Sequence, residues 1–60
     1  MLFTKEQRKY FEDHPDIERA CREKANEAAK GKKTLTGWLY TWGYALQEEK
    51  KKALQEAGLM

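Results

Sequence analysis

The residues that could carry out catalysis or hold a metal ion are few in this sequence. It has one histidine, His14, and one cysteine, Cys21. A zinc site needs three or four protein ligands, so this pair is too small a set, and we expect neither a metal nor a cofactor. A cysteine–histidine nucleophile pair is one interpretation of these residues. We favour the other, in which Cys21 is a small core residue and His14 lies at the end of a helix.

Carboxylates are plentiful, as in EDHPDIE, but they are scattered along segments typical of solvated helix faces. Catalysis by a pair of carboxylates requires a cleft that removes them from water. A chain of 60 residues is too short for us to expect such a cleft. We therefore expect no enzymatic activity.

A second group of residues could bind an anion. The segment KGKKTLT places lysines and threonines directly before a helix, whose first N–H groups attract negative charge. With a helix on each side, this is also the outline of a helix-turn-helix, which would bind nucleic acid through Lys30, Lys32, Lys33, Thr34 and Thr36. However, the next helix presents aromatic side chains instead of polar ones, and the net charge is only +2. Nucleic-acid binding is therefore the alternative, and a solvated lysine loop is the interpretation we favour.

The stretch TLTGWLYTWGYALQ has no charged residue and contains four of the seven aromatic residues. Residues two apart on an α-helix lie about 200° apart around its axis. Trp38 and Trp42 would then face the core, whereas Tyr40 and Tyr44 would lie on nearly the opposite side. A β-strand over residues 34–44 would put all four rings on one face, but the chain has no second strand to pair with it. We favour the helix.

The tyrosine side of this helix has three interpretations. It lies inside the core under the first helix, it binds a second copy or another protein, or it is ordinary surface. Tyrosine combines apolar area with a hydroxyl group and is favoured at interfaces. The candidate partner-binding residues are Trp38, Tyr40, Thr41, Trp42, Tyr44 and Gln47.

Local signals predict where the first two helices begin and end. Thr4 and Gln7 form a capping-box pattern at the start of a short first helix, and Pro15 ends that helix. Pro15 also suits the first turn of a second helix, which runs to about Lys30 and stops at Gly31.

The third helix is predicted to start at Thr34 or Thr36 and to extend to about residue 57. Its length of about 34 Å exceeds the roughly 24 Å of the second helix, so we expect it to overhang its partners and to offer an apolar edge to a second copy. Helical periodicity gives each long helix a core face. The two faces consist of Ile17, Ala20, Cys21, Lys24, Ala25 and Ala28 in the second helix, and of Leu35, Trp38, Leu39, Trp42, Leu46 and Ala53 in the third.

Length and composition set limits on the whole molecule. Sixty residues form one domain, 1–60, and a chain this short buries only about 60% of its unfolded surface, so self-association or a partner would stabilise it. A single cysteine allows no intramolecular disulfide and fits the reducing cytoplasm. The charged start does not resemble a signal peptide, and no uncharged run approaches the roughly 20 residues of a membrane span. We interpret the sequence as a complete small open reading frame.

The sequence therefore predicts an all-α, self-associating protein with a short first helix, a second helix ending near Gly31 and a longer third helix. The expected function is that of a non-enzymatic binding or regulatory protein, which docks its aromatic helix around Trp38–Tyr44 onto a protein partner or a second copy. Phage- or mobile-element-encoded inhibitors and adaptors are often of this size. The alternative is the helix-turn-helix-like nucleic-acid-binding protein. A helix lying on a membrane surface is a weaker interpretation, because the aromatics lie on opposite faces.

Overall fold

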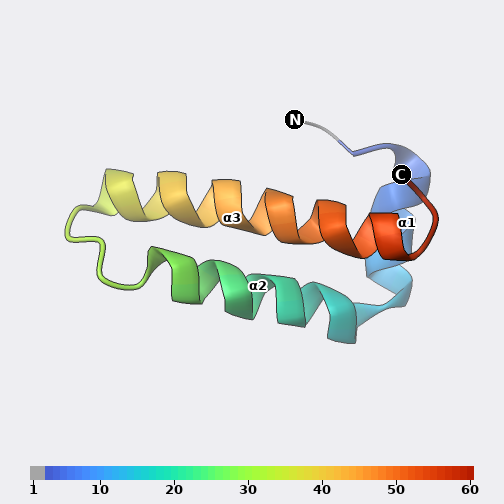
Figure 1. Ribbon diagram of the computed structural model, residues 1–60, viewed down its shortest axis with the longest axis horizontal. Coiled ribbons are helices and arrows are strands. Elements are labelled where there is room, and N and C mark those ends of the chain that lie inside the picture. The colour runs from blue at the N-terminus through green and yellow to red at the C-terminus, as the bar shows by residue number, and fades with distance from the viewer. Residues whose placement is uncertain (1–2) are drawn as a thin grey trace.

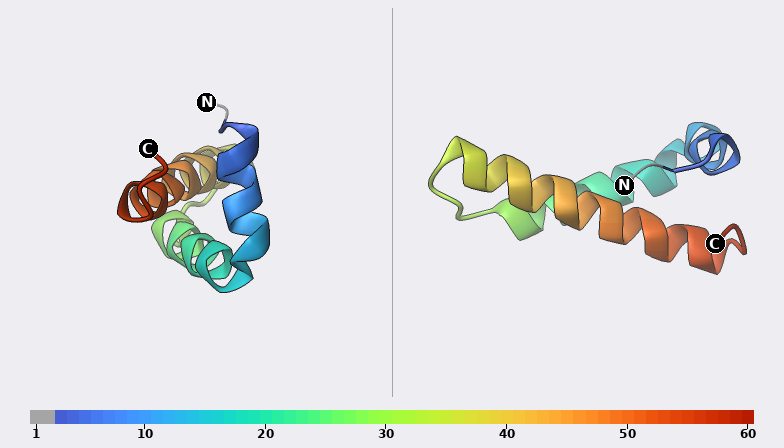
Figure 2. Two further views of the ribbon diagram at one scale, coloured as in Figure 1. Left: turned by 90° about the vertical axis from the view of Figure 1, so that its right-hand side faces the viewer. Right: turned by 90° about the horizontal axis from the view of Figure 1, so that it is seen from above.

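The structure is a computed structural model that describes residues 3–60, and these residues form three helices and no strand (Figure 1). The helices are α1 (Lys5–Asp13), α2 (Pro15–Ala29) and α3 (Leu35–Glu56). α2 and α3 lie side by side as an antiparallel hairpin, and α1 crosses one side of it where α3 ends and α2 begins (Figure 2). The predicted all-α arrangement is confirmed. The strand considered for residues 34–44 is wrong, because α3 is helical from Leu35 onward.

The first helix begins and ends as its local sequence predicts. The Thr4 hydroxyl accepts a hydrogen bond from the Gln7 backbone N–H at 3.2 Å, and the Gln7 side chain accepts one from the Thr4 N–H at 2.8 Å. This reciprocal pair is a capping box. His14 separates α1 from α2, and Pro15 is the first residue of α2. The prediction that His14 lies at a helix end is confirmed.

The turn between the two long helices is also determined locally. Gly31 has a φ of 93°, a left-handed conformation that glycine adopts without steric cost. Thr34 then caps α3, since its hydroxyl accepts a hydrogen bond from the Gly37 N–H at 3.1 Å. The chain therefore reverses direction within a few residues, which places α3 antiparallel to α2.

The core is small and lies where α1 meets the other two helices. Phe11, Cys21 and Leu54 form its buried centre, and Lys50 places its Nζ 5.0 Å from the centre of the Phe11 ring. The predicted core position of Cys21 is confirmed by its exposure of 5%. The partly buried residues around this centre are Phe3, Tyr10, Ile17, Leu46 and Ala53.

The predicted core face of α2 is wrong at two positions, because α2 is rotated slightly from the predicted orientation. Ala20 and Ala28 are exposed, and Ala29 is completely buried in their place. The buried positions Cys21, Ala25 and Ala29 recur every four residues, so the contact with α3 runs along a straight row of small side chains. Alanine at such positions lets the two helix backbones approach closely.

The predicted core face of α3 is wrong at its N-terminal end. Leu35 is 75% exposed and Leu39 is 52% exposed. The reason lies in the position of α1, which covers the opposite end of α3 and contributes nothing here (Figure 1). The expected overhang of α3 is not found at its C-terminal end, because α1 meets this end. The Gln7 side-chain N–H donates to the Leu59 carbonyl at 3.0 Å, and Phe11 packs into one cluster with Leu54.

Candidate docking face on α3

The two tyrosines at the centre of the sequence prediction lie on the surface. Tyr40 is 78% exposed and Tyr44 is 64% exposed. α1 is placed at the other end of α3 (Figure 1) and does not fold over them. The interpretation in which the first helix buries both rings is therefore wrong. Most of the surface of both residues is exposed to solvent.

The two tryptophans lie on a different side of α3, as the helical period predicts, and are half-buried. Their rings are stacked, with centroids 5.9 Å apart and planes at 12°. Trp42 also donates its indole N–H to the side-chain oxygen of Asn26 in α2 at 2.8 Å. This hydrogen bond joins the two long helices and holds the indole against α2. The tryptophans therefore support the fold at this end of the hairpin, and the tyrosines do not share their surface.

Five exposed residues in the first half of α3 form what we call the open face: Leu35, Leu39, Tyr40, Gly43 and Tyr44. A Cβ atom added at Gly43 would have open space around it, with no neighbouring heavy atom within 4 Å. Sequence reasoning found the tyrosines but assigned both leucines to the core. Of the other predicted partner-binding residues, Thr41 and Gln47 are half-buried at the edges of this face.

The lysine loop, which comprises Lys30, Lys32 and Lys33, is exposed. Within the described part of the chain, none of the three ammonium groups forms an ion pair. Thr34 uses its hydroxyl to cap α3, so that group is already engaged, whereas Thr36 is exposed. The three lysines thus lie exposed in the segment that precedes α3.

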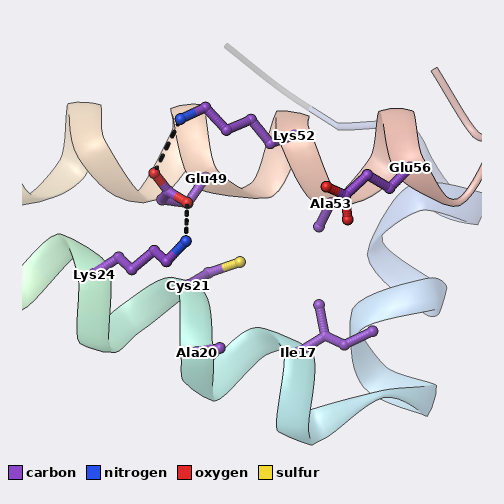
Figure 3. Close-up of a pocket in the computed structure, with 8 residues that line it drawn as sticks. All are labelled: Ile17, Ala20, Cys21, Lys24, Glu49, Lys52, Ala53 and Glu56. Atoms are coloured by element: carbon purple, nitrogen blue, oxygen red, sulfur yellow. Dashed lines mark hydrogen bonds and ion pairs between the residues drawn. The ribbon is translucent and has the colours of Figure 1, made fainter.

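A cavity of about 220 Å³ lies between α2 and α3 near α1 (Figure 3). Lys24 and Lys52 both approach the Glu49 carboxylate, at 3.5 Å each, so this anion is shared by two cations across the opening. Glu56 also lines the cavity, so its two lysines are balanced by two glutamates and the cavity has no strong preference for an anion or a cation. The lining residues are Ile17, Ala20, Cys21, Lys24, Glu49, Lys52, Ala53 and Glu56.

The two potentially reactive side chains have other contacts. Burial raises the pKa of the Cys21 thiol, and the neighbouring Glu49 carboxylate raises it further. A thiol with a raised pKa is a poor nucleophile near neutral pH, because the thiolate is the reactive form. The His14 ring stacks on Tyr10, with centroids 4.4 Å apart, and its Nδ1 lies 2.8 Å from the Tyr10 carbonyl oxygen. These contacts favour structural roles for both residues.

Residues 3–60, which the structure describes, provide neither a metal-binding cluster nor a membrane-crossing helix. No group of three or more histidine, cysteine or carboxylate side chains in this range is arranged to hold a metal ion. None of the helices formed by these residues has the length and apolar character needed to cross a bilayer. In comparisons with known proteins, no family, no curated protein and no solved structure matches the chain.

Proposed function

We propose that this chain is a small, non-enzymatic binding or regulatory protein that docks the open face of α3 onto a protein surface. The observation that carries the proposal is the exposure of Leu35, Leu39, Tyr40 and Tyr44 within one uncharged stretch of a highly charged chain. Contiguous exposed apolar patches on small proteins mark interaction sites. Tyrosine in particular supplies contact area at a low cost in side-chain entropy.

The surrounding structure supports this proposal by making the open face rigid. Trp38 and Trp42 stack on each other, and the hydrogen bond from Trp42 to Asn26 fixes the rotation of α3 relative to α2. A binding surface that is already ordered loses less conformational entropy when a partner binds. We propose that it acts in this way in the cytoplasm, as an inhibitor or adaptor of the size often encoded by a phage or mobile element.

Site-directed photo-cross-linking tests the proposal in cells that express the protein. Replacing Tyr40 with a benzoylphenylalanine should give a covalent adduct of defined mass with a protein. The yield should fall when Tyr44→Ala is added, because both rings belong to one surface. The matched control places the same cross-linker at Glu23, an exposed α2 position. Equal labelling from both positions, or no protein adduct from Tyr40, would contradict the proposal.

Nucleic-acid binding is the second candidate function, and one observation favours it. The three lysines of the lysine loop lie exposed beside a helix N-terminus without an acidic partner among the described residues. Binding through these groups would release counterions and weaken steeply as salt is added. Docking through leucine and tyrosine would depend on salt only slightly. A salt series therefore separates the two candidates.

A further inference from the structure

We propose that the open face is occupied by the open face of a second copy of this chain, with the two α3 helices antiparallel about a two-fold axis. The inference rests on the proposed function, because it uses the same docking face and names the partner. Four features of the open face support a second copy: its shape, its position along α3, its area and its lack of charge.

The shape of the open face is complementary to itself. Gly43 has no side chain, so the helix backbone is bare there, and a Cβ atom would have no neighbour within 4 Å. Tyr40 projects from the preceding turn of the same helix and is 78% exposed. In a two-fold antiparallel pair, Tyr40 of each copy can rest on Gly43 of the other. Because such a contact is isologous, the Tyr40–Gly43 pair occurs twice in the dimer. It also gives a reason for a glycine inside a helix, where glycine is less favourable than alanine.

The position of Gly43 along α3 shows that a helix can pack on this side. Gly43 precedes Leu54 by eleven residues, which is close to three helical turns of about 3.6 residues, so the two positions face nearly the same direction. α1 packs on this side at Leu54 through Phe11. α1 does not cover this side of α3 at Gly43. In the dimer, α3 of the second copy would pack there, as α1 packs at Leu54.

The area of the open face is sufficient for a weak dimer. If a fully exposed tyrosine presents roughly 200 Å² and a leucine somewhat less, the exposed fractions of the two tyrosines and two leucines correspond to about 500 Å² per copy. Two copies that cover this area completely would bury about 1,000 Å² in total, near the lower limit of a specific interface. We therefore expect dissociation in the micromolar range or weaker.

The charge distribution favours the same face. The chain has 12 basic and 10 acidic residues, but none lies between residues 34 and 47. Two copies can meet through this segment without removing a charge from water, which is costly when the charge lacks a partner. The other long stretches of helix surface carry charges of both signs. A second copy therefore meets the smallest desolvation penalty at the open face.

Sedimentation equilibrium of the full chain, from low micromolar to millimolar concentration, tests this inference. We expect the wild type to show a monomer–dimer equilibrium. Gly43→Gln should place a side chain where the partner's ring would rest and raise the dissociation constant at least about tenfold, while the variant stays at least as helical as the wild type in dilute solution. Tyr40→Ala should have a similar effect by removing the projecting ring. Glu23→Gln, on α2 away from the open face, should leave the dissociation constant unchanged.

Two results would overturn the inference: a wild type that stays monomeric over the whole range, or a Gly43→Gln variant that dimerises as tightly as the wild type. Its failure can be distinguished from failure of the proposed function. A monomer whose Tyr40 cross-linker still captures a different protein would refute the second copy and retain the docking face. A monomer that gives no protein adduct would refute both.

Discussion

Trp42 in α3 and Asn26 in α2 are joined by a hydrogen bond of 2.8 Å from the indole N–H to the side-chain oxygen. The bond links the two long helices at the end of the hairpin that α1 does not reach (Figure 1). It directs the Trp42 ring toward α2. The rotation of α3 that follows leaves Leu39 and Tyr40 exposed, so the open face depends on this contact.

The contribution of Trp42 can be measured with two substitutions. Trp42→Phe keeps most of the ring but leaves the Asn26 oxygen without its donor, and should lower the free energy of unfolding by about 1 kcal/mol. Trp42→Ala should lower it by about 3 kcal/mol, the lower end of the usual range for a large aromatic, because this indole is only half-buried. Thermal melting followed by circular dichroism gives both values. Equal stability of Trp42→Ala and wild type would show that α3 is rotated differently.

Two glycines of α3 should respond differently to the same substitution. Gly43→Ala should stabilise the monomer by about 0.5–1 kcal/mol, because alanine favours the helix and its Cβ atom meets open space. At Gly37, a Cβ atom would lie 2.8 Å from the Thr34 hydroxyl oxygen, the group that caps α3. Gly37→Ala should therefore stabilise the protein less than Gly43→Ala does, or should destabilise the start of α3. Melting temperatures of the two variants in dilute solution check this, and a larger gain for Gly37→Ala would contradict it.

The ends of the helices could be predicted from sequence because their signals are local. A capping threonine acts on a backbone N–H three residues away, at Thr4 as at Thr34. Pro15 and Gly31 likewise act through their own backbone conformation. The side of α3 that carries the tyrosines also follows from the helical period once that segment is helical. None of these features depends on how distant parts of the chain pack.

The rotation of the helices and the extent of the open face could not be predicted in this way. Leu35 and Leu46 have nearly the same angular position on α3, yet Leu35 is exposed and Leu46 is partly buried. The difference arises from the long-range packing of α1, which covers only one end of α3. Periodicity identifies an apolar stripe, but it does not state how much of the stripe another helix covers. The exposure of the tyrosines depends on the position of α1 in the same way.

The ionisation of Cys21 makes stability depend on pH. Burial, with the Glu49 carboxylate, raises the pKa of this thiol in the folded protein above its ordinary value of 9.0. The unfolded chain therefore loses this proton first as pH rises. Below about pH 9 the thiol is protonated in both states and does not lower the free energy of unfolding. As the pH rises from the pKa of the unfolded chain to that of the folded protein, the free energy of unfolding falls. Cys21→Ala should consequently show a smaller fall in the free energy of unfolding above pH 9 than the wild type.

The same burial should protect the thiol from modification. Reaction of Cys21 with a disulfide reagent at pH 8 should be much slower in the folded protein than in urea, because the side chain is only 5% exposed and little thiolate is present. A short unfolded peptide with the sequence around Cys21 is the control. A rate in the folded protein equal to that of the peptide would contradict the buried position.

The measurement that tests the central claim most directly compares two double variants side by side. Two quantities are measured for each variant across a salt series. The first is association with protein, which is either a second copy or the partner captured at Tyr40. The second is binding to mixed-sequence DNA. Tyr40→Ala with Tyr44→Ala should weaken protein association at least about 30-fold, the equivalent of roughly 2 kcal/mol for one interface hot spot, while the chain stays helical. Lys32→Gln with Lys33→Gln should change it by less than about threefold, since charges at the rim mainly affect association rates. Protein association that survives the tyrosine changes, together with salt-sensitive DNA binding that the lysine changes abolish, would contradict the account.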